Sequence, residues 1–488
     1  MNQPRPSQPR FKVYLRSLGC PKNRVDSEVI LAALAKSPKA QWQVVAAPEE
    51  ADLIIVNTCA FIDAAQEESV NTILALAALK NAPPKAQTLS PRPPLLIVTG
   101  CLEQRFAQDL PQLLPEVDLF LAADEQPFID RYVQIKNKQL IIHRAAAQHH
   151  PAKTKAKTSP QTKTSPKVPP PRPYYATHAL PRLLSTNPGS AWLKIAEGCN
   201  RRCTFCAIPY FKGGYVSRDM NVLKREAQAL VKQGAHEINL VAQDLSYYGK
   251  DLGLKNGLIH LLQTLEKIKG LRWIRLLYIY PEGLTPALIR YLKTSPKVCP
   301  YLDIPIQHLS DKILQAMGRR IKAREIKKRI LNLRQEIPHI ALRTSILVGF
   351  PGETDEDLAL LQQGLQELQF DHLGVFDYSP QAETPAAKFD GQIKAKVKAQ
   401  RQKLIYRIQQ KIMKQRRKLW LGKTMPAIIE GHHPETDLLL LGRLITQAPE
   451  VDEKVIISQL QKPHQAGDII QLTISQVTAR EIVGQEAT

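Results

Sequence analysis

Three cysteines crowd into one short loop, and this loop constrains the chain more than any other feature of its sequence. Cys199, Cys203 and Cys206 have the spacing C-x3-C-x2-C and directly follow an apolar run at residues 191–196. Three thiolates this close can turn toward one point and hold three irons of a 4Fe–4S cluster, leaving the fourth iron open to an exogenous ligand. The competing interpretation is zinc with one remote ligand, although structural zinc favours C-x2-C pairs and four closed ligands. Three unrelated buried cysteines are the remaining alternative.

Three further cysteines recur at one relative position in the first part of the chain. Each follows an apolar, β-rich run by a few residues: Cys20 follows residues 11–15, Cys59 follows residues 53–56, and Cys101 follows residues 95–98. Helical patterns at residues 26–34 and 64–79 lie between the runs, which indicates strand–loop–helix units in a parallel sheet. Loops at the carboxyl ends of neighbouring parallel strands converge on one edge. The pattern therefore predicts a second three-thiolate site with an open position.

Strands and helices alternate through residues 189–389, which contain the three-cysteine loop. Six apolar runs have the pattern of strands: residues 191–196, 237–241, 273–279, 301–304, 342–348 and 373–378. Helical patterns fall between them, for example at residues 223–232, 258–268 and 323–335. Six strand–helix units indicate an open α/β barrel. The cysteine loop follows the first strand and would lie at the carboxyl face, where such barrels place their chemistry.

The chain ends in a basic helix and a small β-domain. Residues 390–421 have the pattern of one long amphipathic helix, and no acidic residue occurs from 391 to 429. Its apolar stripe favours packing against the barrel. Four short apolar runs then follow between turn signals: residues 427–430, 438–441, 455–457 and 469–474. Closely spaced short strands of this kind indicate a small OB-like β-barrel over residues 422–488, of the type that docks RNA or protein.

The chain is strongly basic. Its formal net charge of +22 over 488 residues points to a polyanionic neighbour, such as RNA or a ribonucleoprotein surface. Solubility alone is the alternative explanation. Residues 144–188 form a Pro/Lys/Thr-rich basic stretch, expected to be a disordered linker between a cluster domain at residues 11–143 and the barrel. We also expect a loose tail at residues 1–10 and an insert at residues 81–94 that loops out of the first domain.

The sequence indicates a cytoplasmic protein. It contains no run of 18 uncharged apolar residues, and its N-terminus lacks an apolar signal-peptide region. Seven cysteines in a reducing compartment favour metal or catalytic use over a disulfide framework. Cys299 has no cysteine partner at metal-ligand spacing and is expected to be a packed thiol that precedes a strand.

With these features in place, the chain resembles the radical S-adenosylmethionine (SAM) methylthiotransferases over nearly its whole length. The cysteine loop, with Phe205 before its last cysteine, looks like the radical SAM signature. The upstream cysteine domain and the terminal barrel, similar to a TRAM domain, match the methylthiotransferases. Four stretches resemble the branch that modifies a ribosomal protein rather than the tRNA branch: SLGCPKN at residues 17–23, YLDIPIQH at 301–308, GVFDYSP at 374–380 and APEVD at 448–452. One departure from the family pattern is Lys212-Gly213, which replaces the more usual Arg-Gly after the cysteine loop.

The resemblance implies a sulfur-group transferase with two 4Fe–4S clusters. The cluster on Cys199, Cys203 and Cys206 would bind SAM, whose reductive cleavage gives a 5′-deoxyadenosyl radical. That radical would abstract hydrogen from the β-carbon of an aspartate in small-subunit ribosomal protein twelve. The auxiliary cluster on the three upstream cysteines would present the sulfur, and a second SAM the methyl group. The implied partners are that ribosomal protein, free or on the ribosome, an external electron donor, and ribosomal RNA through the basic segments.

Two alternatives stay open at this point. A tRNA adenosine methylthiotransferase of the same superfamily would also fit the charge, because a ribosomal substrate is itself surrounded by RNA. A non-catalytic RNA-binding protein with zinc-stapled loops is the alternative from another class. Measured metal content after anaerobic reconstitution separates this second alternative from the enzyme.

Other residues are candidates from position alone. Glu197, Gln243 and Asp244 stand at the ends of expected strands and are candidate contacts for SAM or substrate. His308 is interpreted as a hydrogen-bonded or substrate-adjacent side chain rather than a metal ligand. The stretch at residues 349–353 has the pattern of a tight turn.

Overall fold

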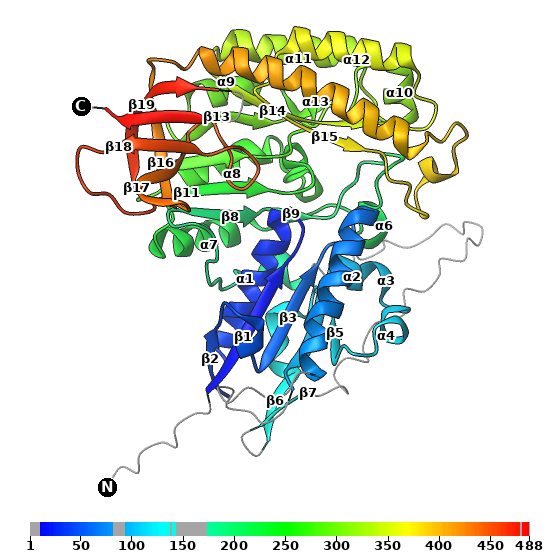
Figure 1. The fold of residues 1–488 in the computed structure, drawn as a ribbon, viewed down its shortest axis with the longest axis vertical. Helices are drawn as coiled ribbons and strands as arrows, with labels where there is room; N and C mark the ends of the chain where they lie inside the picture. The colour runs from blue at the N-terminus through cyan, green and yellow to red at the C-terminus, as the bar shows by residue number, and fades with distance from the viewer. Residues whose placement is uncertain (1–9, 82–92, 137–138, 143–172, 479–480, 488) are drawn as a thin grey trace. The chain divides into compact units, whose positions relative to one another are not determined.

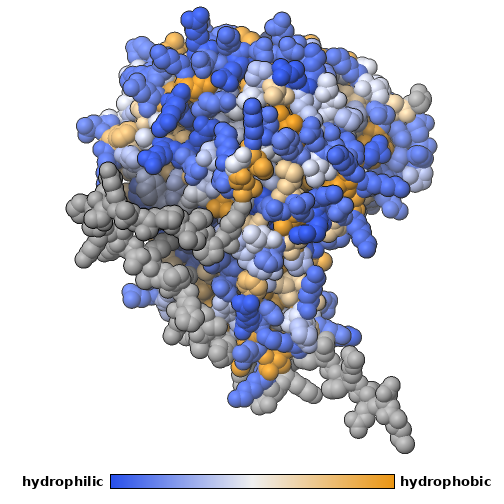
Figure 2. All heavy atoms as spheres, turned by 180° about the vertical axis from the view of Figure 1, so that it is seen from behind, coloured by the Kyte–Doolittle hydropathy of each residue, from blue (hydrophilic) through white to orange (hydrophobic). Residues whose placement is uncertain are grey.

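A computed structural model describes residues 10–81, 93–136, 139–142, 173–478 and 481–487. The chain divides into two compact units, unit 1 (Met1–Leu183) and unit 2 (Leu184–Thr488) (Figure 1). Most of the expected tail, the expected insert and the first part of the expected linker lie outside the described residues. None of the helices in the described ranges is long and apolar enough to cross a membrane. Figure 2 shows one face of the molecule, on which hydrophilic side chains predominate and hydrophobic ones are scattered among them.

Unit 1 is built on a parallel sheet with the strand order β2-β1-β3-β4-β5. Its strands are β1 (Arg10–Ser17), β2 (Gln41–Val44), β3 (Leu53–Thr58), β4 (Leu95–Gly100) and β5 (Leu119–Leu121). The helices are α1 (Pro21–Ala35), α2 (Asp63–Ala77), α3 (Cys101–Phe106) and α4 (Leu110–Leu113), and a hairpin of β6 (Val133–Lys136) and β7 (Gln139–Ile142) follows. All six residues of β3 are buried, as expected for a central parallel strand covered on both faces. The predicted parallel-sheet domain is confirmed, and its three cysteine-bearing strands are direct neighbours.

The end of the expected linker is structured, contrary to the expectation of disorder over residues 144–188. Helix α5 (Tyr174–Thr177) lies within it. A few residues further on, Arg182 donates from Nε to Glu28 Oε2 at 2.9 Å, and both residues are buried. The buried carboxylate of Glu28 on α1 thus fixes this basic segment through Arg182. The composition of the segment gave no indication of this bond.

Unit 2 contains six parallel strands that pair in chain order, so the sheet is open between β8 and β15. The strands are β8 (Ser190–Lys194), β11 (Glu237–Val241), β12 (Trp273–Leu276), β13 (Val298–Asp303), β14 (Ala341–Val348) and β15 (His372–Asp377). The main helices between them are α7 (Met220–Lys232), α8 (Gly257–Glu266), α9 (Pro286–Thr294), α10 (Asp311–Ala316), α11 (Ala323–Glu336) and α12 (Asp355–Leu368). Strands and helices bury one continuous aliphatic core. All six predicted strands are present.

A long helix and a closed barrel complete unit 2. Helix α13 (Ala395–Lys418) falls within the predicted range 390–421. The barrel has the order β16-β17-β18-β20-β19. Its strands are β16 (Thr424–His433), β17 (Thr436–Leu444), β18 (Val455–Gln459), β19 (Ile469–Val477) and β20 (Ile482–Glu486). The sequence did not predict β20, because only its first two residues are aliphatic and it lacks the apolar run of the other strands.

Candidate functional site

The three upstream cysteines lie at the carboxyl ends of adjacent strands in unit 1. Cys20 follows β1 and caps the start of α1, Cys59 directly follows β3, and Cys101 directly follows β4 as the first residue of α3. Because β1, β3 and β4 are parallel neighbours, these positions share one edge of the sheet.

One side chain ties the cysteine-bearing segments together. Asn23, on the first turn of α1, donates from Nδ2 to the carbonyl oxygens of Leu18 (2.9 Å) and Thr58 (2.8 Å). Its Oδ1 lies 3.7 Å from the Sγ of Cys101. Asn57 Nδ2 in turn donates to the Asn23 carbonyl at 2.8 Å. Sequence reasoning missed Asn23, although its place three residues after Cys20 puts it on the helix turn nearest that cysteine.

The chain before Cys20 presses directly against Cys59. Gly19 has φ +82°, and a Cβ there would lie 2.7 Å from the Cys59 Cβ and 2.9 Å from its Sγ. Burial raises the pKa of the Cys59 thiol, and the neighbouring Cys20 raises it further. A metal cluster binds thiolates, so its assembly here must displace protons. Three soft sulfur donors at one sheet edge are the donor type of a 4Fe–4S cluster. Within the described ranges, however, no group of three or more His, Cys, Asp or Glu is placed to hold a metal ion.

We expect Gly19→Ala to weaken the auxiliary cluster selectively. The new methyl group would overlap Cys59, and alanine resists a positive φ. After anaerobic reconstitution, iron should fall from about eight toward about four per chain, while SAM cleavage persists. Gly253→Ala is the matched control, because Gly253 has φ +72° and open space around its would-be Cβ. Full iron content in the Gly19 variant would contradict the prediction that a Cβ at residue 19 overlaps Cys59 and weakens the cluster.

The loop of Cys199, Cys203 and Cys206 follows β8 and the short strand β9 (Ala196–Glu197) in unit 2. Thr204 anchors its middle: its N–H donates to Met317 O (3.0 Å) and its hydroxyl to Ala316 O (2.7 Å). These carbonyls belong to the end of α10, so the neighbouring helix fixes the loop.

Tyr280 lies beside the sulfur atoms of this loop. Its hydroxyl is 4.0 Å from Cys203 Sγ, and the guanidinium groups of Arg201 and Arg319 lie 4.3 and 4.4 Å from its ring centroid. Burial raises the pKa of Tyr280 well above its usual value, Arg319 opposes that shift, and all three thiols of the loop reinforce it. The loop therefore brings its three sulfurs within electrostatic range of one hydroxyl. Sequence reasoning missed these three residues, since only the fold places them together.

The thiols of this second site are also shielded from water. Burial raises the pKa of Cys199 to about 11 and that of Cys206 to about 12. Metal ligation must again release protons. A pocket of about 310 Å³ opens beside Cys203, and cationic side chains predominate in its lining. The three thiols are the donor type that 4Fe–4S clusters use, and the pocket beside Cys203 leaves room for a ligand.

Glu197 and Gln243, both candidates from the sequence, meet in the structure. Gln243 Nε2 donates to Glu197 Oε1 at 3.0 Å, and Lys194 Nζ lies 2.9 Å from Glu197 Oε2. Lys212 Nζ lies 4.0 Å from Glu197 Oε1, so the family's more usual arginine is replaced by another cation at this point. Burial alone would raise the pKa of Glu197, but Lys194 and Lys212 outweigh it and lower that pKa far below its usual range. Glu197 is therefore a fixed anion at the mouth of the barrel.

Asp244 is occupied within the chain. Its Oδ2 accepts from Arg201 Nε at 3.0 Å, and its Oδ1 accepts from Ser246 N at 3.0 Å. Its carbonyl oxygen accepts from the Tyr215 hydroxyl at 2.9 Å. Asp244 thus holds Arg201, a residue of the cysteine loop, against the end of β11.

The remaining candidates take part in packing or hydrogen bonding within unit 2. His308 is fully buried, its Nδ1 accepts from Ser310 N at 3.0 Å, and burial lowers its pKa to about 4. Cys299 is the second residue of β13 rather than preceding the strand, and burial raises its pKa to about 12. Glu353 closes the turn at residues 349–353, because its Oε2 accepts from Gly349 N at 2.7 Å.

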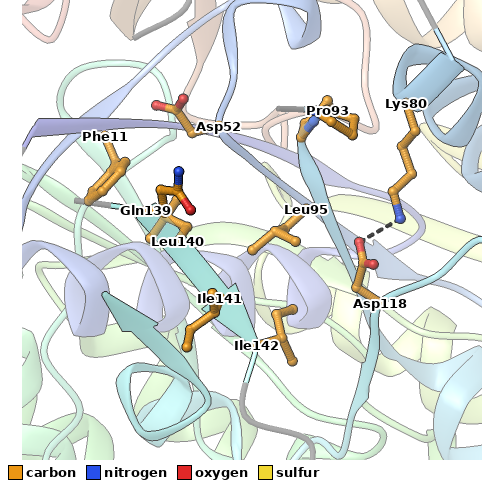
Figure 3. Close-up of a pocket in the computed structure, with 11 residues that line it drawn as sticks. Phe11, Asp52, Lys80, Pro93, Leu95, Asp118, Gln139, Leu140, Ile141 and Ile142 are labelled. Atoms are coloured by element: carbon orange, nitrogen blue, oxygen red, sulfur yellow. Dashed lines mark hydrogen bonds and ion pairs between the residues drawn. The ribbon is translucent and has the colours of Figure 1, made fainter. Parts of the chain in front are cut away.

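The pocket drawn in Figure 3 lies at the opposite edge of the unit 1 sheet from the cysteines. Asp52 and Asp118, which directly precede β3 and β5, line it together with Lys80 (Figure 3). Lys80 Nζ donates to Asp118 at 2.6 Å, and the Lys12 N–H donates to Asp52 at 2.8 Å. These bonds fix the starts of strands and account for the charges of the pocket.

Comparisons with known proteins cover all three parts of the chain. Family models match residues 12–122 (Uncharacterized protein family UPF0004), 193–363 (Radical SAM superfamily) and 421–486 (TRAM domain). The chain is 42% identical to the ribosomal protein uS12 methylthiotransferase RimO of Geobacter sulfurreducens, across 98% of this chain and 99% of that protein. It is 39% identical to the protein of the same name from Acetivibrio thermocellus, across 97% and 98%.

Among solved structures, the fold is similar to TsrM from Kitasatospora setae, a radical SAM methyltransferase with cobalamin and a [4Fe-4S] cluster bound. The TM-score is 0.53 at 13% identity, over 78% of this chain and 74% of that one, so this likeness concerns the fold alone. The family models and the curated relatives confirm the predicted enzyme class, a radical SAM methylthiotransferase, and its cofactors, SAM and 4Fe–4S clusters. The chain belongs to the RimO family of ribosomal protein uS12 methylthiotransferases.

Proposed function

We propose that this enzyme methylthiolates the β-carbon of an aspartate in ribosomal protein uS12, the small-subunit protein twelve. The observation that carries the proposal is identity of 37–42% with uS12 methylthiotransferases over nearly the full chain. The two three-cysteine sites support it, because sulfur insertion at an unactivated carbon needs both a radical source and a sulfur source. We place the reaction in the cytoplasm, with uS12 free or on the ribosome and with an external electron donor.

The six cysteines divide the chemistry between them. When bound, a 4Fe–4S cluster on Cys199, Cys203 and Cys206 would supply the electron that cleaves SAM, and an auxiliary cluster on the upstream cysteines would supply the sulfur. The loop that carries Cys199, Cys203 and Cys206 is held in place by the hydrogen bonds of Thr204 and by the bond between Asp244 and Arg201. These bonds position its sulfur atoms in advance. Cys59, Cys101, Cys199 and Cys203 are buried, which limits the access of water to reactive species.

Glu197 and Gln243 are the residues that we assign to binding SAM or substrate. Both stand at the carboxyl ends of strands, and Glu197 is only two residues from Cys199. Glu197 stays anionic through its lysine neighbours and therefore suits a cationic or hydrogen-bond-donating ligand group. Asp244 acts instead as a positioning residue for the cysteine loop.

Mass spectrometry of ribosomal protein uS12 and of bulk tRNA from a deletion strain tests this function. We expect uS12 to lose its methylthio group, the tRNA marks to persist, and this chain expressed in trans to restore the uS12 group. Loss of a tRNA mark alone would overturn the proposal in favour of the tRNA-modifying branch. Bound zinc without iron after anaerobic reconstitution would overturn the enzyme assignment itself.

A further inference from the structure

Helix α13 is labelled in Figure 1. Its cationic side chains form two sets with different surroundings. The inner set is bonded to the rest of unit 2. Lys398 Nζ donates to Tyr378 O at 2.5 Å, and Arg401 pairs with Glu353 at 2.9 Å. Further along, Arg416 pairs with Asp371 at 2.8 Å, and Arg417 pairs with Glu453. These bonds hold the helix in place and account for the inner cations.

The outer set forms a single row, which we call the basic stripe. Its members are Lys396, Lys403, Arg407, Lys411, Lys414 and Lys418. All six are exposed, and none has an ion pair among the residues that the structure describes. At 3.6 residues per turn they fall within an arc of about 80°, and at 1.5 Å per residue they extend over about 33 Å. The helix thus presents one straight face of a single charge.

The structure gives the basic stripe no stabilising role. Like charges three or four residues apart repel each other and weaken a helix. Other helices of unit 2 mix charges at their surface: Lys327 of α11 pairs with Glu367, and Lys293 of α9 pairs with Glu336. A surface made only for solubility would intersperse both signs in the same way. No acidic residue occurs from 391 to 429, so no acidic side chain on α13 offsets the positive charge of the stripe.

We propose that the basic stripe binds the phosphate backbone of duplex RNA in the small ribosomal subunit. The proposal rests on the proposed function, since a ribosomal protein substrate is surrounded by RNA. Five of the six cations are lysines, which contact phosphates as point charges without reading bases. The exposed apolar side chains of this part of the helix, Leu404 and Tyr406, lie on opposite sides of the stripe and form no continuous patch of the kind on which protein partners concentrate binding energy. A rigid row of about 33 Å therefore fits a regular polyanion better than an acidic protein.

Neutralising the stripe tests the proposal. The variant Lys403→Gln, Arg407→Gln, Lys411→Gln, Lys414→Gln, Lys418→Gln removes five charges while keeping good helix formers. Its control, Lys224→Gln, Arg225→Gln, Lys232→Gln, Lys267→Gln, Lys269→Gln, removes five exposed cations in or beside α7 and α8. Fluorescence anisotropy of the reconstituted full chain with a 20-base-pair RNA duplex would follow binding from low to moderate salt.

We expect the stripe variant to bind the duplex at least about 30-fold more weakly than wild type near 100 mM salt. Its slope of log K against log salt should be shallower by about 3 to 4, because each lost phosphate contact removes somewhat less than one unit. The control should bind within about twofold of wild type. Equal affinity and equal slope in the stripe variant would overturn the proposal, as would stronger binding of anionic lipid vesicles or of polyglutamate than of the RNA duplex.

A second measurement separates this inference from the proposed function. With free uS12 as substrate, the stripe variant should retain the wild-type rate, because the stripe lies outside the cysteine sites. With intact small subunits its rate should fall by about tenfold at subsaturating enzyme. If wild type modifies neither substrate while the difference in RNA binding persists, the proposed function fails and the stripe assignment stands. Equal rates of variant and wild type on intact subunits would overturn the stripe as a ribosome contact.

Discussion

Replacing Cys199, Cys203 and Cys206 together with alanine should stop SAM cleavage completely and remove about half of the iron. These thiols are the only sulfur donors on their loop, so the substituted loop has no thiolate with which to hold a 4Fe–4S cluster. Anaerobic reconstitution should give about four irons per chain instead of about eight. Chromatographic detection of 5′-deoxyadenosine after reduction with dithionite measures the cleavage, and we expect none above background.

The matched variant at the upstream site should behave differently. Replacing Cys20, Cys59 and Cys101 with alanine should also leave about four irons, but SAM cleavage should continue while methylthiolation is lost. Cys299→Ala should keep both activities, because Cys299 is buried near the amino end of β13, away from the carboxyl ends of the strands where the other cysteines lie. Loss of SAM cleavage in the upstream variant with the other cluster intact would contradict the division between a radical site and a sulfur site.

Most of the architecture could be predicted from the sequence, because the strands that precede the cysteines are buried and apolar. The strands β3 and β4 appear as short aliphatic runs, and Cys59 and Cys101 stand directly after their carboxyl ends, where parallel topology dictates that they converge. Strand β20 escaped prediction because its apolar run is too short. Strands β2 and β5 escaped because one is largely exposed and the other has only three residues.

The groups that support the cysteines were not predictable in the same way. Asn23 bonds to Thr58, 35 residues away, and Arg201 reaches Glu282, 81 residues away. Such contacts depend on tertiary structure and have no local signature, whereas metal ligands are marked by residue type and spacing. Glu197 was found from its position at a strand end, but its lysine partners and its link to Gln243 required the fold.

Glu237→Ala should be among the most destabilising single substitutions in unit 2. Glu237 is the first residue of β11, and its carboxylate is fully buried between two guanidinium groups. Its Oε1 accepts from Arg275 Nε at 2.9 Å and from Arg443 Nη1 at 3.1 Å, and its Oε2 accepts from Ser190 Oγ at 2.8 Å. Alanine would leave two buried cations without their shared anion. Breaking a buried ion pair from one side costs about 3–5 kcal/mol.

Urea denaturation followed by tryptophan fluorescence measures the effect, since three of the four tryptophans lie in unit 2. Glu336→Ala is the control: it removes an exposed pair with Lys293 at 3.1 Å, for which we expect a loss below about 1 kcal/mol. In a thermal denaturation followed by the same fluorescence, the midpoint temperature of the Glu237 variant should fall on the order of 10 °C. Equal losses in the two variants would contradict a large contribution of this buried network to the stability of unit 2.

The same carboxylate should make unit 2 sensitive to acid. Burial alone would raise the pKa of Glu237, but Arg443 and Arg275 lower it to about 2. Its folded pKa is thus below the unfolded value of about 4.3, so its contribution is fully present above that pH. The contribution is lost as pH falls from about 4.3 through about 2, where the folded carboxylate takes up its proton. Glu237→Gln should therefore show a smaller loss of stability between pH 5 and pH 3 than wild type, and an unchanged slope would contradict the charge assignment.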